Sequence, residues 1–557
     1  MRARAWAVAL VLAVLVAVVY AQSGRFDSLD FDDQEYVYRN PPVLRGLTAG
    51  GVAWALTAFH SANWHPLTWI SHMLDVQLFG ADPGAHHLVN AGFHVLNAAL
   101  LFLILRAATS AFWPSAFVAA LFAVHPLNVE PVAWISQRKS LLSTLFLLLA
   151  LEAYMLWTRR GGGWRYGAVI ALLALGLLAK SMLVSAPLLF LAFDFWPLGR
   201  LGDQAAGRKR LIEKIPLFVL AAGSSIATLL AQAKWGAVAS AFRFRERVEN
   251  ALDSTVTYLG DAVWPARLAC FYPHPASTGG STRFVDAMSA GVLLLAITAL
   301  VIAVRRSRPW LLFGWAWYLF ALAPVIGIVQ VGMQGRADRY TYVPMIGIWV
   351  AVVWEFAECV RGSKVVRLAA STAGALAVGA FGVAAYVQAG TWRNAETLYT
   401  HALHVTQNNW LASNNLGNAW LAQHDDQGAL GLFEQAARIN PDYEQAWYNQ
   451  GVALMNLSRP EESLEAYAEN LRLDPSNTDG WVNAGFVLLQ LGRLQEGLKA
   501  FEKALSQRPE DPLALYGIAA ARAGLGDGAG ALQYLARLER LDPVRAADLR
   551  RNLSLAR

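Results

Sequence analysis

The residues best suited to chemistry are acidic, and they lie in a short stretch that follows the first apolar run of the chain. Asp27, Asp30, Asp32, Asp33 and Glu35 are all found there. Adjacent carboxylates in a loop diverge in direction, so Asp32 and Asp33 are expected to have different roles. One can accept a proton from a nucleophile or ligate a cation, while the other orients that nucleophile or holds the loop by hydrogen bonds. Alternatively, the acidic loop only marks the outer face of a membrane.

Basic residues at the ends of later apolar runs form a second group of candidates. Arg138 and Lys139 open one run, Lys180 separates two others, and Arg336 and Arg339 precede a further run. Cations at a lipid–water boundary suit phosphate binding, and they would stabilise a phosphate leaving group. Taken singly, each is also explained by snorkelling to lipid headgroups. Several of them on the face that carries the carboxylates are harder to explain in that way.

The histidines and cysteines carry a weaker signal. His65 and His125 each precede a proline at the boundary of an apolar run, where a structural role is favoured. His87 and His94 share a helix face but are too far apart to bind one metal ion. The cysteines, Cys270 and Cys359, have no ligand spacing, so neither a disulfide framework nor a zinc site is supported.

The composition identifies the elements that must position these groups. Of 557 residues, 56% are hydrophobic and only 15% are charged, with a mean hydropathy of +0.35. Soluble domains carry roughly 25% charged residues, so this is an integral membrane protein. The net charge of +6 does not indicate a nucleic-acid partner, because the basic residues cluster between apolar runs, as topology signals do.

The apolar runs predict a polytopic bundle of about eleven crossings in residues 1–390. Basic residues before the first run place the N-terminus in the cytoplasm, although a signal peptide is an alternative for residues 5–21. The first external loop, at about residues 22–86, is expected to be partly helical. Residues 251–285 must stay outside or re-enter. Asp194 is interpreted as an interfacial anchor at the cytoplasmic end of its run.

The sequence after residue 390 changes character. Following a connector at 391–406, a 34-residue period extends from about 407 to 544, with Asn440-Pro441, Asp474-Pro475, Arg508-Pro509 and Asp542-Pro543 in register. Glycines and aromatic residues recur at the same interval. This is the tetratricopeptide (TPR) signature, which predicts about four helix pairs stacked as an α-solenoid. A basic tail, 545–557, follows. The alternation of crossings places the repeats on the same side as the acidic loop.

With these features together, the chain resembles the transmembrane-and-TPR protein O-mannosyltransferase family and its bacterial relatives, within the GT-C class of glycosyltransferases. The resemblance covers nearly the whole chain. It rests on the TPR array and on these segments: Phe31-Asp32-Asp33, His65-Pro66-Leu67, residues 125–130 (HPLNVE) with Arg138-Lys139, and residues 337–344 (ADRYTYVP).

The resemblance implies a sugar, mannose by the family name, moved from a polyprenyl phosphate to a Ser or Thr hydroxyl outside the bacterial inner membrane. Asp32 or Asp33 would then be the general base, with a slight preference for Asp32. Whether the acidic loop also holds a divalent metal is left open. The TPRs would bind an acceptor protein or a partner. The candidates for binding the lipid-phosphate sugar are His65, Arg138, Lys139, Lys180 and Arg339.

Two other functions remain. An O-antigen ligase or oligosaccharide polymerase also combines many spans with TPRs, but it places key basic residues in a large late external loop, and here the gap at about 329–340 is short. A non-enzymatic membrane-anchored TPR scaffold for envelope assembly would not need so many spans.

Overall fold

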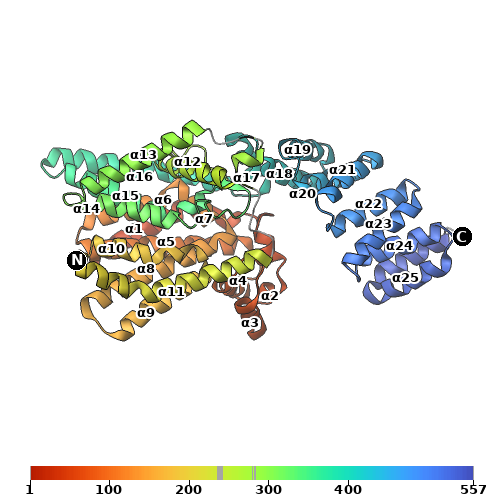
Figure 1. The fold of residues 1–557 in the computed structure, drawn as a ribbon, viewed down its shortest axis with the longest axis horizontal. Helices are drawn as coiled ribbons and strands as arrows, with labels where there is room; N and C mark the ends of the chain where they lie inside the picture. Colours follow the sequence, from red (N-terminus) through yellow and green to blue (C-terminus); the bar gives the residue numbers. More distant parts are fainter. Residues whose placement is uncertain (1, 203, 235–241, 279, 281–283, 556–557) are drawn as a thin grey trace. The chain divides into compact units, whose positions relative to one another are not determined.

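The computed structural model describes residues 2–202, 204–234, 242–278, 280 and 284–555 (Figure 1). It divides into two compact units, Met1–Thr406 and Gln407–Arg557. Both consist almost entirely of helices, and the strands in the described ranges are the short β1 (Tyr272–Pro273) and β2 (Gln334–Arg336). The prediction of an all-α protein is confirmed.

Long apolar helices dominate the first unit. Within the described residues, six are long and apolar enough to cross a membrane, or seven if one bent pair counts as a span. Three shorter apolar helices accompany them, so the predicted number of about eleven crossings stays a prediction. The six are α1 (Arg2–Tyr20), α5 (Pro83–Thr109), α8 (Arg138–Arg160), α11 (Gln204–Lys234), α13 (Phe284–Ala303) and α16 (Lys364–Gly390).

The bent pair joins α6 (Phe112–Val124) to the segment Pro126–Ala133 at an angle of 58°. The proline after His125 explains the break, because it cannot continue the backbone hydrogen bonding of α6. The shorter apolar helices are α9 (Gly163–Ala179), the segment Ser181–Phe195 with α10 (Ala186–Phe195), and α14 (Pro309–Leu322). The other helices of this unit are α2 (Pro41–Leu44), α3 (Ala49–Thr57), α4 (Pro66–Phe79), α7 (Val129–Ala133), α12 (Phe244–Val263), α15 (Pro344–Cys359) and α17 (Ala395–Val405).

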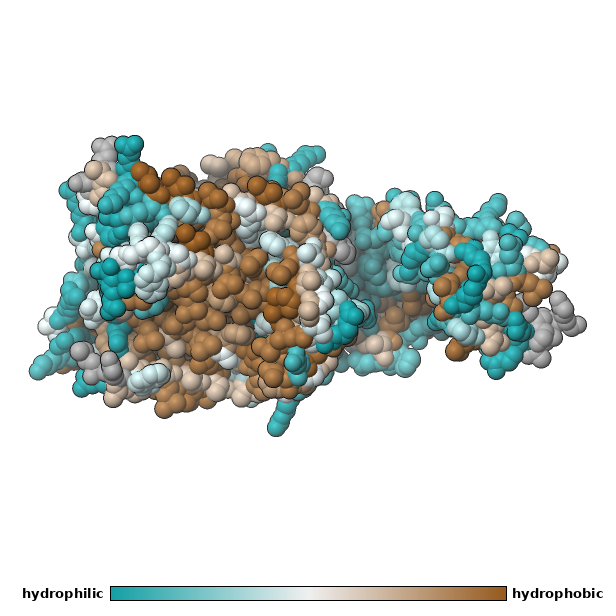
Figure 2. Space-filling model, turned by 90° about the horizontal axis from the view of Figure 1, so that it is seen from below, coloured by the Kyte–Doolittle hydropathy of each residue, from teal (hydrophilic) through white to brown (hydrophobic). Residues whose placement is uncertain are grey.

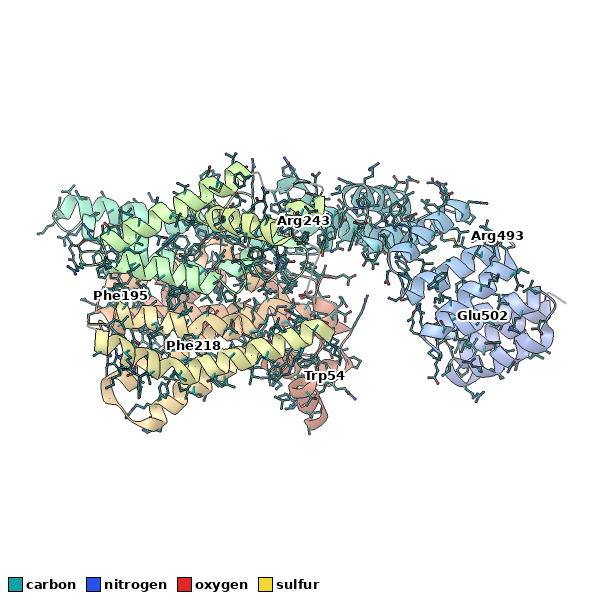
Figure 3. The ribbon with its side chains drawn as sticks, viewed as in Figure 1. Trp54, Phe195, Phe218, Arg243, Arg493 and Glu502 are labelled. Atoms are coloured by element: carbon teal, nitrogen blue, oxygen red, sulfur yellow. The ribbon has the colours of Figure 1, made fainter. Side chains whose placement is uncertain are left out.

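The outer surface of these helices is apolar. Leu295 on α13 and Leu376 on α16 expose 71% and 69% of their surface, and Phe218 on α11 is exposed as well (Figure 3). Figure 2 shows a face of the first unit on which hydrophobic residues predominate. A soluble protein rarely presents so large a continuous apolar surface, whereas lipid-facing helices do. The first unit is therefore built to integrate into a membrane.

Close helix packing arranges the interior of the bundle. α8 packs against α5 and α9, and α14 packs along α15. A Cβ placed on Gly314 would lie 2.3 Å from the Gly347 carbonyl oxygen, and a Cβ on Gly347 would lie 2.4 Å from that of Gly314. Small residues thus bring α14 and α15 into backbone contact, as is typical of membrane helices.

The first loop is folded against the start of α8. Its short helices α2, α3 and α4 share a buried core that includes Tyr36, Trp69 and Met73. Ile135, immediately before α8, belongs to the same core. The apolar contacts therefore fix the acidic stretch beside the N-terminal end of a long helix.

The second unit is a stack of helix pairs, as the 34-residue period predicts. A Cβ on Gly485 would lie 2.7 Å from the ring of Phe501, and Gly451 stands in the same relation to Tyr467. The repeated glycine therefore makes room for the repeated aromatic residue. The helices are α18 (Trp410–Ala422), α19 (Asp426–Ile439), α20 (Glu444–Asn456), α21 (Pro460–Leu473), α22 (Thr478–Gln490), α23 (Leu494–Gln507), α24 (Pro512–Gly524), α25 (Gly528–Leu541) and α26 (Pro543–Leu555).

The basic tail is not an unstructured extension. Its residues up to Leu555 form α26, which buries Ala546 and Leu549 against the last repeat. The tail thus covers the end of the solenoid, where an exposed apolar face would otherwise remain.

Candidate functional site

Asp33 is buried and holds the first loop in place. Its Oδ2 accepts a hydrogen bond from the backbone N–H of Leu29 at 3.0 Å, and its Oδ1 accepts one from the N–H of Ser136 at 3.0 Å. Burial raises the pKa of Asp33 to about 7, although these two N–H donors favour the charged form. Both carboxylate oxygens are thus occupied, and their bonds join the acidic loop to the segment before α8.

Asp32 has the opposite environment. Its side chain is 41% exposed, and its Oδ2 lies 3.4 Å from Lys139 Nζ. No backbone group holds this carboxylate within the described residues, so it is free to accept a proton from a hydroxyl group placed beside it. The two aspartates therefore differ in their surroundings, since backbone donors hold Asp33 and a lysine ammonium lies beside the exposed Asp32.

Lys139 is almost fully buried, in contact with Tyr36. Its Nζ lies 3.3 Å from the Tyr36 hydroxyl and 4.4 Å from the centre of that ring. His65 Nδ1 lies 3.0 Å from the same hydroxyl. Burial, together with the charges of Lys139 and Lys180, lowers the pKa of His65 well below its usual value. A neutral His65 orients Tyr36, so it reaches the site through that tyrosine and not as a cation.

Lys180 and Arg339 bring further positive charge to the same place. Lys180 Nζ donates a hydrogen bond to Ser140 Oγ at 2.9 Å, and Ser140 is the residue that follows Lys139 in the sequence. Arg339 pairs with Glu130, its Nη1 lying 2.5 Å from Oε1. Lys180 is close enough to Lys139 and Arg339 for their charges to act on it, and Asp32 acts on Arg339. Lys139, Lys180 and Arg339 are called the cationic cluster below.

Arg138 does not belong to the cationic cluster. It is fully buried and points to the other side of the α8 N-terminus, where it forms an ion pair with Asp75. It also donates to Asn90 Oδ1 at 2.7 Å and to the His86 carbonyl at 2.8 Å. Successive helical residues project about 100° apart, which explains why Arg138 and Lys139 separate. The guanidinium is occupied by these contacts, so the structure does not place it with the other phosphate candidates.

A two-stranded sheet positions Arg339. β1 and β2 pair antiparallel, with Tyr272 opposite Arg336. Arg336 lies over the Tyr272 ring and forms an ion pair with Asp261 at 2.7 Å. The Tyr272 hydroxyl donates to Asp338 Oδ1 at 3.0 Å. These contacts occupy Arg336 and Asp338, whereas Arg339 pairs with Glu130 as a member of the cationic cluster.

Two residues of the site have no role in the sequence interpretation. The Glu130 carboxylate accepts hydrogen bonds from the backbone N–H and from the guanidinium of Arg339, and Tyr36 connects Lys139 to His65. Both lie in stretches that the sequence singles out, next to Asp32 and before Arg138-Lys139. Their spacing in the sequence does not indicate these contacts, because their partners are distant in the chain.

Comparison with known proteins agrees with this organisation. The tetratricopeptide repeat family matches residues 384–444, 427–478 and 483–546. The chain is 23% identical to mouse protein O-mannosyl-transferase TMTC3 over 445 residues, which cover 72% of this chain and 47% of the relative. It is 25% identical to fruit fly (Drosophila melanogaster) protein O-mannosyl-transferase Tmtc3 over 72% of this chain and 51% of the relative. The chain thus spans about half the length of these relatives.

A shorter match is closer in sequence. Drosophila melanogaster protein O-mannosyl-transferase Tmtc2 is 30% identical over 183 residues, covering 29% of this chain and 19% of the relative. Among solved structures, YrrB, a TPR protein with an unusual peptide-binding site, is similar at 23% identity and a TM-score of 0.26. That similarity covers 28% of this chain and 80% of YrrB. MamA matches at 20% identity and a TM-score of 0.25, over 27% of this chain and 82% of MamA. The relatives that are similar over 72% of this chain are thus named as protein O-mannosyl-transferases.

Proposed function

We propose that the protein is a glycosyltransferase that moves a sugar from a polyprenyl phosphate to a Ser or Thr hydroxyl of a protein outside the cytoplasmic membrane. The observation that carries the proposal is the exposed Asp32 carboxylate beside the cationic cluster. In the part of the chain that the structure describes, Lys180 has a hydroxyl partner and no ion pair with a carboxylate. A phosphate is a ligand of the right charge for such a cluster.

The residues suggest how the reaction proceeds. Asp32 accepts the proton of the acceptor hydroxyl as its oxygen forms a bond to the anomeric carbon. The bond from that carbon to the phosphate oxygen breaks, and the electron pair leaves with the phosphate. The cationic cluster stabilises the negative charge that develops there. Attack and departure on opposite faces of the sugar invert the anomeric configuration.

The donor and the membrane fit one another in this proposal. The polyprenyl tail occupies the bilayer beside the apolar helices, and the sugar reaches the outer surface, where nucleotide sugars are absent. The TPR unit shares that side by the predicted topology, with the N-terminus in the cytoplasm. Its helical repeats provide a surface for an extended or helical segment of the acceptor or of a partner protein.

The test is a transfer assay with the purified full-length protein and polyprenyl-phosphate mannose, polyprenyl-phosphate glucose or a nucleotide sugar, each with Ser/Thr peptides. We expect transfer from a lipid-linked donor only. Asp32→Asn should lower kcat/KM by about 10²–10⁴-fold, the usual contribution of a general base. Asp30→Asn, which removes an exposed carboxylate of the same loop, is the matched control and should transfer normally.

Parallel reactions with Mg²⁺ and with EDTA decide whether a divalent ion at the acidic loop takes part. Transfer that survives in Asp32→Asn would remove Asp32 from the mechanism. Absence of transfer from every lipid-linked sugar would contradict the proposed function.

A further inference from the structure

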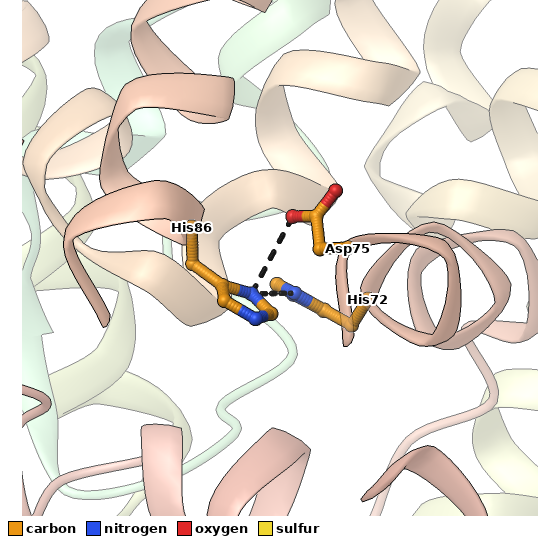
Figure 4. A group of neighbouring side chains, drawn as sticks. All are labelled: His72, Asp75 and His86. Atoms are coloured by element: carbon orange, nitrogen blue, oxygen red, sulfur yellow. Dashed lines mark hydrogen bonds and ion pairs between the residues drawn. The ribbon is translucent and has the colours of Figure 1, made fainter. Parts of the chain in front are cut away.

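A cluster of ligand-type side chains lies beside Arg138, at the N-terminal end of α8. His72 and Asp75 occupy successive turns of α4, and His86 stands in the first turn of α5 (Figure 4). His72 Nδ1 and His86 Nδ1 are 3.1 Å apart, and His86 Nδ1 is 3.4 Å from Asp75 Oδ2. All three side chains are buried, and one potential ligand atom from each lies within 4.8 Å of the others.

These separations match the edges of a tetrahedral coordination shell. Imidazole nitrogen binds Zn²⁺ at about 2.0–2.1 Å, which places two such nitrogens roughly 3.3 Å apart. Two imidazoles and one carboxylate are a common ligand set for a divalent transition ion, and they leave one position open. The three residues could therefore close around an ion with little movement.

Hydrogen bonding alone leaves this cluster incompletely satisfied. Two imidazoles that face each other through Nδ1 can share one proton, so only one of them donates. The Nε2 atoms of both His72 and His86 are buried and have no hydrogen-bond partner among the described residues. Buried polar atoms usually form hydrogen bonds, and two buried histidines without a metal ion would normally be oriented so that more of their ring nitrogens do so. The inward direction of both Nδ1 atoms is the direction that a shared metal ion requires.

Arg138 supplies an outer contact of the kind that metal sites have. It forms an ion pair with Asp75, and it also donates to the His86 carbonyl at 2.8 Å. Ligating carboxylates are commonly held in this way by a second group that fixes their orientation.

We propose that His72, Asp75 and His86 bind one divalent transition ion of the Zn²⁺ type. The ion joins α4 of the first loop to α5 of the bundle, and Arg138 connects it to the start of α8. Because Lys139 follows Arg138 directly, the bound ion steadies the helix end that carries Lys139, a member of the cationic cluster, and Ser140, which accepts a hydrogen bond from Lys180. The site is separate from Asp32, and it does not depend on the reaction proposed above.

Metal content of the full-length protein tests the proposal without any activity measurement. Protein purified in detergent without chelators, or reconstituted with Zn²⁺, should contain about one ion per chain by elemental analysis. His72→Gln and His86→Gln should each lower that content at least tenfold. His94→Gln is the matched control, because His94 is equally buried on α5 but bonds to Tyr342 and the Ala123 carbonyl.

One spectroscopic and one thermal measurement use the wild-type protein, so they test the site even if a variant folds poorly. Wild-type protein loaded with Co²⁺ should show the visible absorption bands of a tetrahedral nitrogen–oxygen site. Chelation should lower the Tm of the wild type, and Zn²⁺ should restore it. Background metal content after reconstitution, or equal content in the wild type and both histidine variants, would overturn the proposal. A Tm that neither chelator nor Zn²⁺ changes would also overturn it.

Discussion

The two ends of α8 carry charged clusters that differ in how completely they are paired. At the C-terminal end, Lys214 Nζ lies 2.6 Å from Asp194 Oδ2, and Arg200 lies 2.7 Å from Asp194 and 3.1 Å from Glu213. The Tyr154 hydroxyl donates to the same aspartate. At the N-terminal end, Lys139 is 3.4 Å from a half-exposed Asp32, and the partner of Lys180 among the described residues is the Ser140 hydroxyl.

The difference separates a structural cluster from a candidate site. In a buried cluster that only stabilises the fold, each charge needs a close partner, since an unpaired buried charge is costly. Asp194, Glu213, Arg200, Lys214 and Tyr154, called the Asp194 cluster, meet that condition. In the cationic cluster, Lys180 does not meet it within the described residues, and a phosphate would bring the negative charge that its ammonium lacks. The same substitution of lysine by methionine at both ends should therefore have opposite consequences.

Lys214→Met should have the largest effect on stability. Lys214 and Asp194 are both fully buried, so removing the ammonium takes from the buried carboxylate its closest cation and leaves it with Arg200 and the Tyr154 hydroxyl. The expected loss is about 3–5 kcal/mol of unfolding free energy. Thermal unfolding in detergent measures it, with Lys209→Met, an exposed lysine on the same helix, as the control. An unchanged Tm would show that the Asp194 cluster is not the tightly coupled structural unit that its distances indicate.

Lys180→Met should spare stability and impair transfer. Lys180 is surrounded by like charges from Lys139 and Arg339, so its removal relieves repulsion and the Tm should stay constant or rise. A hydrogen bond to a charged group is worth about 1.5–3 kcal/mol, and kcat/KM should fall by roughly 10- to 100-fold. Steady-state kinetics with a lipid-linked donor measure this loss. A Lys180→Met variant with a lower Tm and normal kinetics would show that the cationic cluster stabilises the fold and does not take part in transfer.

The sequence predicts the elements better than the directions of side chains within them. The TPR unit follows from its period, because Gly451 and Tyr467 repeat at fixed positions and pack locally. The acidic loop and Lys180 are also identifiable from their places at the ends of apolar runs. By contrast, nothing in the pair Arg138-Lys139 shows which residue faces Asp32, since that depends on the rotation of α8.

Asp194 illustrates the same limit. Its position near the end of an apolar run predicts an interfacial anchor, but the structure buries it completely. Its partners Arg200 and Lys214 come from segments that fold back onto α8, and sequence spacing does not reveal such contacts. Glu130 is hidden for the same reason, because its partner Arg339 is far away in the chain.

A pH dependence distinguishes Asp33 from Asp32, and its expected change per pH unit is smaller than either loss above. The pKa of Asp33 is raised from 3.8 to about 7 in the folded protein, first of all by burial. Between these two values the folded state holds the proton more tightly than the unfolded state. The free energy of unfolding should therefore fall as pH rises from about 4 to about 7, by at most about 1.4 kcal/mol per pH unit, and then level off.

The asparagine of Asp33→Asn cannot bind or release a proton. Between pH 5 and pH 7, the Tm of this variant in detergent should therefore fall less steeply than the Tm of the wild type. Asp32→Asn is the matched control: it removes the neighbouring negative charge, a smaller cause of the raised pKa than burial, and should keep most of the wild-type slope. If both variants decline in parallel with the wild type, Asp33 is not the buried, proton-binding residue that the two backbone hydrogen bonds and its complete burial indicate. A slope that disappears in Asp32→Asn instead would exchange the roles of the two aspartates, making Asp32 the residue that holds the loop.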